Sequence, residues 1–214
     1  GRHGGGIHNL NGIPVLRQVT ISNNAAGASG QGGGINSSGG SLILEEIVFL
    51  NNSAAHGGGL WGSNLTLKEV LFNGNIASVN GGGLYGQDSL FLKAVSFTNN
   101  RALNGGGLYT QMSNSLMFTN VSFIRNSATD LGGGMLNYRS LNPSFLTNIE
   151  CIGNTAARGG GLYNRLIASS VTVTNAVIVG NSAAHGGGMY NSSLGSNLGS
   201  VQLINSTLGY NQAS

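Results

Sequence analysis

The chain repeats itself along its whole length, and the clearest mark of the repeat is a run of three glycines. An aliphatic residue follows every run, and successive runs begin 24 to 28 residues apart. They begin at Gly4, Gly32, Gly57, Gly81, Gly105, Gly132, Gly159 and Gly186. A period of this length is typical of solenoid proteins, in which each repeat is a structural unit that packs on its neighbours.

Each repeat also carries one asparagine in a fixed slot, with an alanine two residues after it. Both residues recur in all eight repeats, which rules out an accident of composition. The asparagines are Asn24, Asn52, Asn75, Asn100, Asn126, Asn154, Asn181 and Asn211. If the repeats are stacked coils, these amides lie above one another, and we expect each to bond to the next coil as in a stacked amide ladder.

Between glycines and asparagine, apolar residues alternate with polar ones. In the fourth repeat, Leu90, Leu92, Val95 and Phe97 lead to Asn100. This alternation predicts short strands, and no segment keeps a helical period. Three strands in about 25 residues predict one coil of a parallel β-helix. We therefore expect an all-β fold, a right-handed single-stranded parallel β-helix of about eight coils of 24–32 residues, forming one domain over residues 1–214.

Composition narrows the class of protein further. Charged residues are only 7 % of the chain, and 9 Lys and Arg against 6 Asp and Glu give a net charge of +3. The cations are spread along the sequence, which argues against a nucleic-acid partner.

The single cysteine, Cys151, excludes an internal disulfide. It falls in the Phe slot of its coil, so we expect it to be a small buried hydrophobe. No apolar run approaches membrane-spanning length.

Catalytic chemistry would need acidic residues that converge, as in β-helix enzymes that degrade polysaccharides. The acidic residues are Glu45, Glu46, Glu69, Asp88, Asp130 and Glu150. Glu45 shares its slot with Arg17 and Lys68, which predicts an ion row on a solvated edge, and the other acids fall in different parts of the repeat. His56 and His185 are five coils, about 24 Å, apart, too far to share a metal. We therefore expect no enzyme activity and no catalytic, cofactor or metal site.

A row of aromatic residues follows the aliphatic residue of each repeat. It consists of Trp61, Tyr85, Tyr109, Tyr163 and Tyr190, with His8, Asn36 and Leu136 in the remaining coils. Strand alternation points these side chains away from the core. Two interpretations stay open: an exposed stripe that binds sugars or another rod, or rings that stack and are covered by the following loop. The longest insertion, Asn191 to Ser200, follows this row and predicts loops for partner contacts along one edge.

The spacing Phe-x-x-Asn followed by Gly-Gly-Gly-Leu resembles the repeat of the chlamydial polymorphic outer-membrane proteins. The strict form occurs at Phe49–Asn52, Phe72–Asn75, Phe97–Asn100 and Phe123–Asn126. Ile21, Cys151, Ile178 and Leu208 replace Phe in the other repeats, and Gly stands where that family often has Ala. The resemblance implies a right-handed parallel β-helix passenger on a bacterial surface, such as an adhesin, and carries over no catalytic residue.

Neither end of the sequence has the polar or helical cap that closes many solenoids. The chain also starts without an initiator Met or a signal peptide, which indicates processing. When the C-terminal residues are written directly before the N-terminal residues, the joined sequence resembles a junction between two repeats within the chain. We therefore expect either a piece of a longer β-helix or a subunit that polymerises. The junction would involve Gly1, Arg2, His3, His185, Asn211 and Ser214.

These observations predict a secreted, processed structural protein, extracellular or on the cell surface, that assembles with itself into a head-to-tail β-solenoid filament or surface fibre. The alternative is an adhesin or autotransporter-type passenger segment that binds surface glycans. A polysaccharide-degrading enzyme or an ice-binding protein fits less well. Ice binding needs outward threonines in coil after coil, and only Thr172 and Thr174 show that local pattern.

Overall fold

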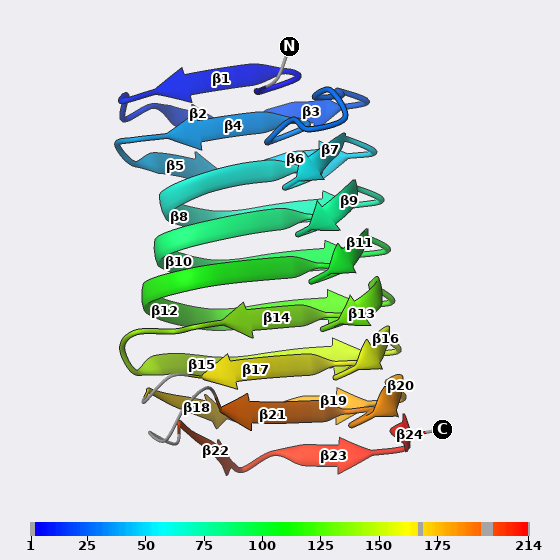
Figure 1. Ribbon diagram of the computed structural model, residues 1–214. Coiled ribbons are helices and arrows are strands. Elements are labelled where there is room, and N and C mark those ends of the chain that lie inside the picture. Colours follow the sequence, from blue (N-terminus) through cyan, green and yellow to red (C-terminus); the bar gives the residue numbers. More distant parts are fainter. Residues whose placement is uncertain (1–2, 167–168, 194–198, 214) are drawn as a thin grey trace.

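The computed structural model describes residues 3–166, 169–193 and 199–213, and its strands stack in parallel as a β-solenoid of about seven turns. The described residues contain strands and turns but no helix. In Figure 1 the chain winds steadily from the N-terminus at one end of the stack to the C-terminus at the other. The predicted all-β parallel solenoid is confirmed, and its turn count is close to the eight repeats of the sequence.

The strands form two sheets that run along the rod. The smaller sheet takes one short strand from each coil after the first, directly after the ladder asparagine. It contains β7 (Ser53–His56), β9 (Ile76–Asn80), β11 (Arg101–Asn104), β13 (Ser127–Leu131), β16 (Thr155–Arg158), β20 (Ser182–His185) and β24 (Gln212–Ala213).

The larger sheet wraps around the rest of each coil, and in the central coils its strands continue around a bend. The early strands are β1 (Ile7–Leu10), β2 (Val15–Arg17), β3 (Thr20–Ser22), β4 (Ile35–Ser38), β5 (Leu42–Glu45) and β6 (Val48–Leu50). The central strands are β8 (Leu60–Asn73), β10 (Leu84–Thr98), β12 (Leu108–Ile124), β14 (Met135–Tyr138) and β15 (Ser144–Ile152). The late strands are β17 (Leu162–Leu166), β18 (Ser170–Thr174), β19 (Val177–Val179), β21 (Met189–Ser193), β22 (Ser200–Ile204) and β23 (Thr207–Gly209).

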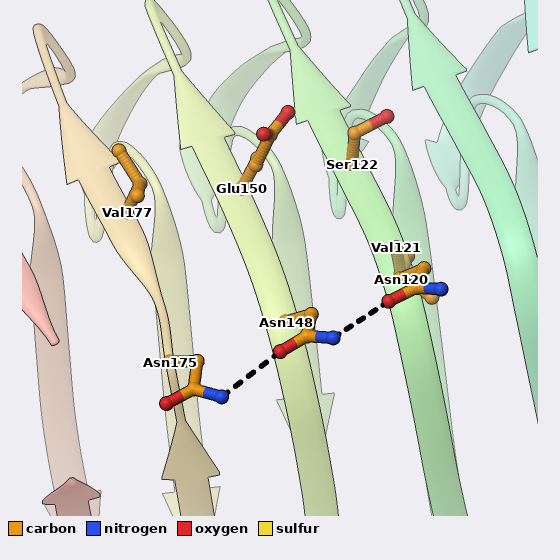
Figure 2. A pocket seen from close by; sticks show the side chains of 7 residues that line it. All are labelled: Asn120, Val121, Ser122, Asn148, Glu150, Asn175 and Val177. Carbon is orange, nitrogen blue, oxygen red and sulfur yellow. Dashed lines mark hydrogen bonds between the residues drawn. The ribbon is translucent and has the colours of Figure 1, made fainter. Parts of the chain in front are cut away.

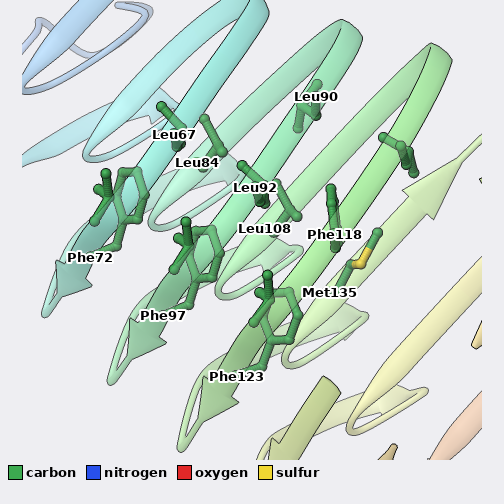
Figure 3. Close-up of a cluster of buried hydrophobic side chains, with 14 of the residues drawn as sticks. Leu67, Phe72, Leu84, Leu90, Leu92, Phe97, Leu108, Phe118, Phe123 and Met135 are labelled. Atoms are coloured by element: carbon green, nitrogen blue, oxygen red, sulfur yellow. The ribbon is translucent and has the colours of Figure 1, made fainter. Parts of the chain in front are cut away.

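Register between coils places like residues on top of one another. On β10, Phe97 pairs with Phe72 of β8 on one side and with Phe123 of β12 on the other. The rings of Phe72 and Phe97 are 4.8 Å apart and those of Phe97 and Phe123 are 5.0 Å apart, nearly parallel in both cases. Figure 3 shows these rings stacked beside the leucines of the same coils. The solenoid interior is therefore a series of matched apolar layers.

Cys151 continues the phenylalanine slot into the next coil. It pairs with Phe123 in register, and no part of it is exposed. Burial raises the pKa of its thiol far above the ordinary value, with a smaller contribution from Glu150. The predicted role as a buried hydrophobe is confirmed, because an uncharged thiol without solvent access is a poor nucleophile.

The eight asparagines form a continuous ladder along the rod. The Asn100 amide donates to Asn126 Oδ1 at 3.0 Å and to the carbonyl of Phe72 at 2.9 Å. Its own oxygen accepts from the backbone and side-chain N–H groups of Asn75 at 2.9 and 3.0 Å. Since the same pattern recurs in neighbouring coils, these buried amides are satisfied, and the predicted ladder is confirmed.

The glycine triplets form a tight corner between the two sheets. The first glycine of each triplet has a positive φ, for example 62° at Gly105, which favours glycine. A Cβ on the second glycine, Gly106, would lie 2.4 Å from the carbonyl oxygen of Gly133 in the next coil. A triplet is needed because the first position requires the backbone conformation, and the second and third have no room for a side chain; a Cβ on Gly107 would lie 2.6 Å from the carbonyl oxygen of Gly134.

Candidate functional site

The aromatic row lies beneath other side chains. Tyr85 and Tyr109 are each 6 % exposed and Tyr163 is 4 % exposed, while Trp61 and Tyr190 are half-buried. Of the two interpretations left open by the sequence, the exposed stripe does not hold for the three buried tyrosines. The alternative, that the rings stack and are covered, holds for them. Since so little of their surface is accessible, these rings do not offer a platform on which a sugar could stack.

The cover comes from the neighbouring small sheet. The ring of His56, at the end of β7, meets the ring of Tyr85 edge-on at 5.7 Å, and Leu131 of β13 packs on the same cluster. Tyr85 and Tyr109 stack at 4.9 Å. This second apolar cluster lies outside the main core, where the small sheet folds over the outer face of the large one. Burial raises the pKa of the Tyr85 hydroxyl and lowers the pKa of His56.

One coil interrupts the aromatic row, and a neighbouring tyrosine fills the gap. Leu136 takes the aromatic slot of β14, and Tyr138, two residues later on the same strand face, places its ring 6.2 Å from that of Tyr109. The guanidinium carbons of Arg139 and Arg165 each lie 5.4 Å from the centre of the Tyr138 ring. We call these two residues the arginine pair. These two residues could not be found from the sequence, because Tyr138 and Arg165 share a register position that only the coil geometry reveals.

One ion pair of the predicted ion row is present, between β2 and β5. Arg17 Nε lies 2.6 Å from Glu45 Oε2, and Glu45 pairs in register with Lys68. The hydrogen bond from Arg17 lowers the pKa of the Glu45 carboxyl below its ordinary value. The row is exposed to solvent, so it is weak as a stabilising element.

The acidic and histidine side chains do not converge. Among residues 3–166, 169–193 and 199–213, no group of three or more His, Cys, Asp or Glu residues is placed to hold a metal ion. His56 is half-buried and His185 exposed, in the same slot of separate coils. His3 is also exposed, with its ring 5.9 Å from that of His8. The sequence-based expectation that the chain is not an enzyme stays a prediction.

A shallow groove of about 310 Å³ runs across three coils on another face (Figure 2). Asn120, Asn148 and Asn175 form a short exposed amide ladder along its edge, with hydrogen bonds of 2.8 and 3.1 Å. Ser122 and Glu150 lie beside it. Glu150 is the only titratable side chain that lines this groove, so the groove offers no acid–base pair.

An apolar stripe faces solvent on the large sheet. Phe91, Met117 and Phe145 are 42, 49 and 53 % exposed, and they occupy one slot of successive coils. Ile43 and Thr66 continue the slot toward the N-terminus and line a hollow of about 360 Å³ with Phe91 and Met117. Alternation predicts that the residue between two inward leucines points outward, so this stripe could have been read from the sequence.

The proposed junction residues fall partly outside the described residues. Gly1, Arg2 and Ser214 lie outside them, as does part of the insertion from Asn191 to Ser200. Asn211 accepts the ladder hydrogen bonds of Asn181. In the last coil, Leu208 is 49 % exposed although its register partner Ile178 is fully buried. The apolar layers of the core are therefore open to solvent at this coil.

Comparison with known proteins adds one finding. Residues 69–87 and 94–111 match the Chlamydia polymorphic membrane protein repeat. The two stretches contain Phe72–Asn75 and Phe97–Asn100 with the glycine runs that follow them, so the resemblance inferred from these motifs is confirmed. Neither the curated proteins nor the solved structures include a match to the chain. The repeat points to the outer membrane or cell surface and to an autotransporter-type passenger.

The described part of the chain contains no helix that is long and apolar enough to cross a bilayer.

Proposed function

We propose that the chain is a structural rod of a surface-exposed bacterial protein, built like an autotransporter passenger and without catalytic activity. The observation that carries the proposal is the continuous in-register stacking of the coils, together with the match to a surface-protein repeat. A rod of stacked coils holds its outer side chains at fixed spacing and projects them from the surface. The low charge and the solvent-facing apolar stripe suit such an extracellular scaffold.

A second candidate is the head-to-tail filament, because the parallel stacking of like coils that joins the late strands could also join one copy of the chain to the next. Leu203 and Leu208 occupy slots that are buried in the preceding coil, where Val173 and Ile178 are fully covered. A further coil stacked on this surface would bury both leucines and pair the free strand edges. In a filament, that coil belongs to the next copy of the chain.

Electron microscopy of the purified chain and antibody labelling of intact source cells test both candidates. The rod proposal expects single elongated particles and antibody label on unpermeabilised cells. The filament expects particles that lengthen with protein concentration and shorten when Leu208 is replaced by Lys. Compact particles, or label only after permeabilisation, would contradict the surface rod. Particles of constant length at every concentration would contradict the filament.

A further inference from the structure

We propose that the arginine pair, Arg139 and Arg165, binds a carboxylate or sulfate group of an acidic polysaccharide. The proposed site lies on the outer face of β14 and β17, next to the buried aromatic row. It concerns residues that neither the repeat motifs nor the aromatic row contain. Binding by the purified chain depends only on this site, so it can be tested separately from the surface location.

The fold places both arginines against one tyrosine ring. Tyr138 and Arg165 are register partners in adjacent coils. The backbone N–H of Arg139 donates to the carbonyl of Arg165 at 2.8 Å, which fixes the two main chains side by side. Both guanidinium carbons lie 5.4 Å from the Tyr138 ring centre, within the usual range for a cation–π contact. Tyr109 stacks on the same ring and limits its movement.

Charge at this place is not balanced by the protein. All six acidic side chains of the sequence are described, and the ion pairs found among them involve Glu45 and Glu69 at other sites. The Nε of Arg139 is buried and has no hydrogen-bond partner among the described residues. Two half-buried cations without a carboxylate are costly for a fold, because each loses hydration and repels the other. A bound oxyanion would neutralise the charge of both guanidinium groups.

The chemistry of arginine selects the ligand group. Planar guanidinium groups bind carboxylates and sulfates through paired charge-assisted hydrogen bonds. Along the same outward slot, the coils on either side carry neutral side chains, Gln87, Gln111 and Ser192. A nucleic acid would need cations at many successive positions. A single cationic position among amides and a hydroxyl instead suits a polymer rich in hydroxyl groups with widely spaced anions.

The spacing of the coils fits an extended glycan. Rungs of the rod recur about every 4.8 Å, which is close to the length of one hexose unit. A chain lying along the rod could therefore place one sugar on each coil, with its acidic group at the arginine pair. The buried aromatic row supports this surface from below and keeps it rigid.

Isothermal titration calorimetry tests the proposal with purified protein and four probes: a sulfated hexasaccharide, an oligogalacturonate, a neutral hexasaccharide and inorganic sulfate. We expect at least one acidic oligosaccharide to bind, more weakly as salt rises, and the neutral one not to bind. Arg165→Gln should weaken binding at least tenfold. Arg125→Gln, which removes an exposed arginine at a different corner of the coil, should change it less than twofold.

Thermal unfolding separates a binding role from a packing role. Without ligand, Arg165→Gln should melt at or above the wild-type temperature, because one unbalanced cation is gone. The acidic oligosaccharide should raise the melting temperature of wild type and not of the variant. A lower melting temperature of Arg165→Gln with no binding by wild type would show that the pair only packs on Tyr138. Equal affinity for inorganic sulfate would overturn the polysaccharide as ligand.

Discussion

Asn100 takes part in four side-chain hydrogen bonds at the centre of the ladder, whereas Asn24 at one end donates one to Asn52. Asn100→Ala leaves buried donors of Asn75 and the carbonyl of Phe72 without partners. We expect it to lower the free energy of unfolding by about 3 kcal/mol or more. Asn24→Ala should cost about 1 kcal/mol or less. Urea denaturation of both variants gives the comparison, and equal losses would contradict a continuous ladder.

His56 gives the rod a specific dependence on pH. Burial against Tyr85 lowers the pKa of its imidazole below the ordinary value of 6.5. As the pH falls below about 6.5, the unfolded chain takes up this proton before the folded chain does, so stability is lost on acidification. We expect His56→Gln to lose less stability than wild type between about pH 7 and pH 5.

Melting temperatures measured across that range test the contribution of His56. His185→Gln, in the same slot but exposed, is the control and should keep the wild-type profile. An unchanged profile in His56→Gln would show that another group carries the acid sensitivity.

The corner residues show which positions can be predicted from the sequence one residue at a time and which cannot. The ladder asparagines could be predicted because each recurs in its slot. The residue just before each has a positive φ, and that slot holds Asn51, Gly74, Asn99 and Arg125 in successive coils. Asn and Gly adopt this conformation readily, but Arg does not, so composition alone hides the slot. The backbone there is set by the coil, and the side chain only has to tolerate it.

Strand β10 carries two phenylalanines with opposite surroundings. Replacing each of them in turn tests the register of the whole coil. Phe97 is stacked between two other rings in the core, whereas Phe91 faces solvent on the apolar stripe. Phe97→Ala should lower the free energy of unfolding by about 3–5 kcal/mol, since it opens a cavity in a close-packed layer. Phe91→Ala should cost about 1 kcal/mol or less.

Chemical denaturation of the two variants, with circular dichroism as the readout, measures this difference. Similar losses in both variants would mean that the alternation of β10 is not as described. A large loss for Phe91→Ala alone would indicate a shift of the strand by one residue, because such a shift exchanges the two faces.

The aromatic row shows why alternation predicts direction but not exposure. The alternation of the strand correctly predicted that the side chains of Tyr85 and Tyr109 point away from the main core. It could not show that β7 to β13 would fold His56 and Leu131 over them, because that contact depends on the angle between the two sheets at the glycine corner. The arginine pair was hidden for the same reason. Its members are 26 residues apart in the sequence and meet only through the stacking of coils.

At the scale of the molecule, the rod is close to one-dimensional, since each coil contacts mainly the coils before and after it. Fold, ladder and core layers could be predicted because they repeat eight times. The candidate binding surfaces could not, because they lie where the repeat varies. Stability in such a protein is a sum over coils and their interfaces, so end coils open more easily than central ones. In the last coil, Leu203 and Leu208 are 39 and 49 % exposed.

Cys151 allows this gradient of stability to be measured, because it is the only cysteine and is fully buried. It lies two coils before the last coil. Its thiol can react with a maleimide only after the coils that cover it open. We expect labelling to begin at a lower urea concentration than the loss of the circular dichroism signal.

The variant Cys151→Ala with Val95→Cys moves the thiol to the buried Val95 position in the centre of the rod. Its labelling should require more urea than labelling of Cys151, after correction for any change in global stability. Identical protection at both positions would mean that the solenoid opens as a single cooperative unit. In that case the interfaces between coils, and not the coils themselves, would hold most of the stability of the rod.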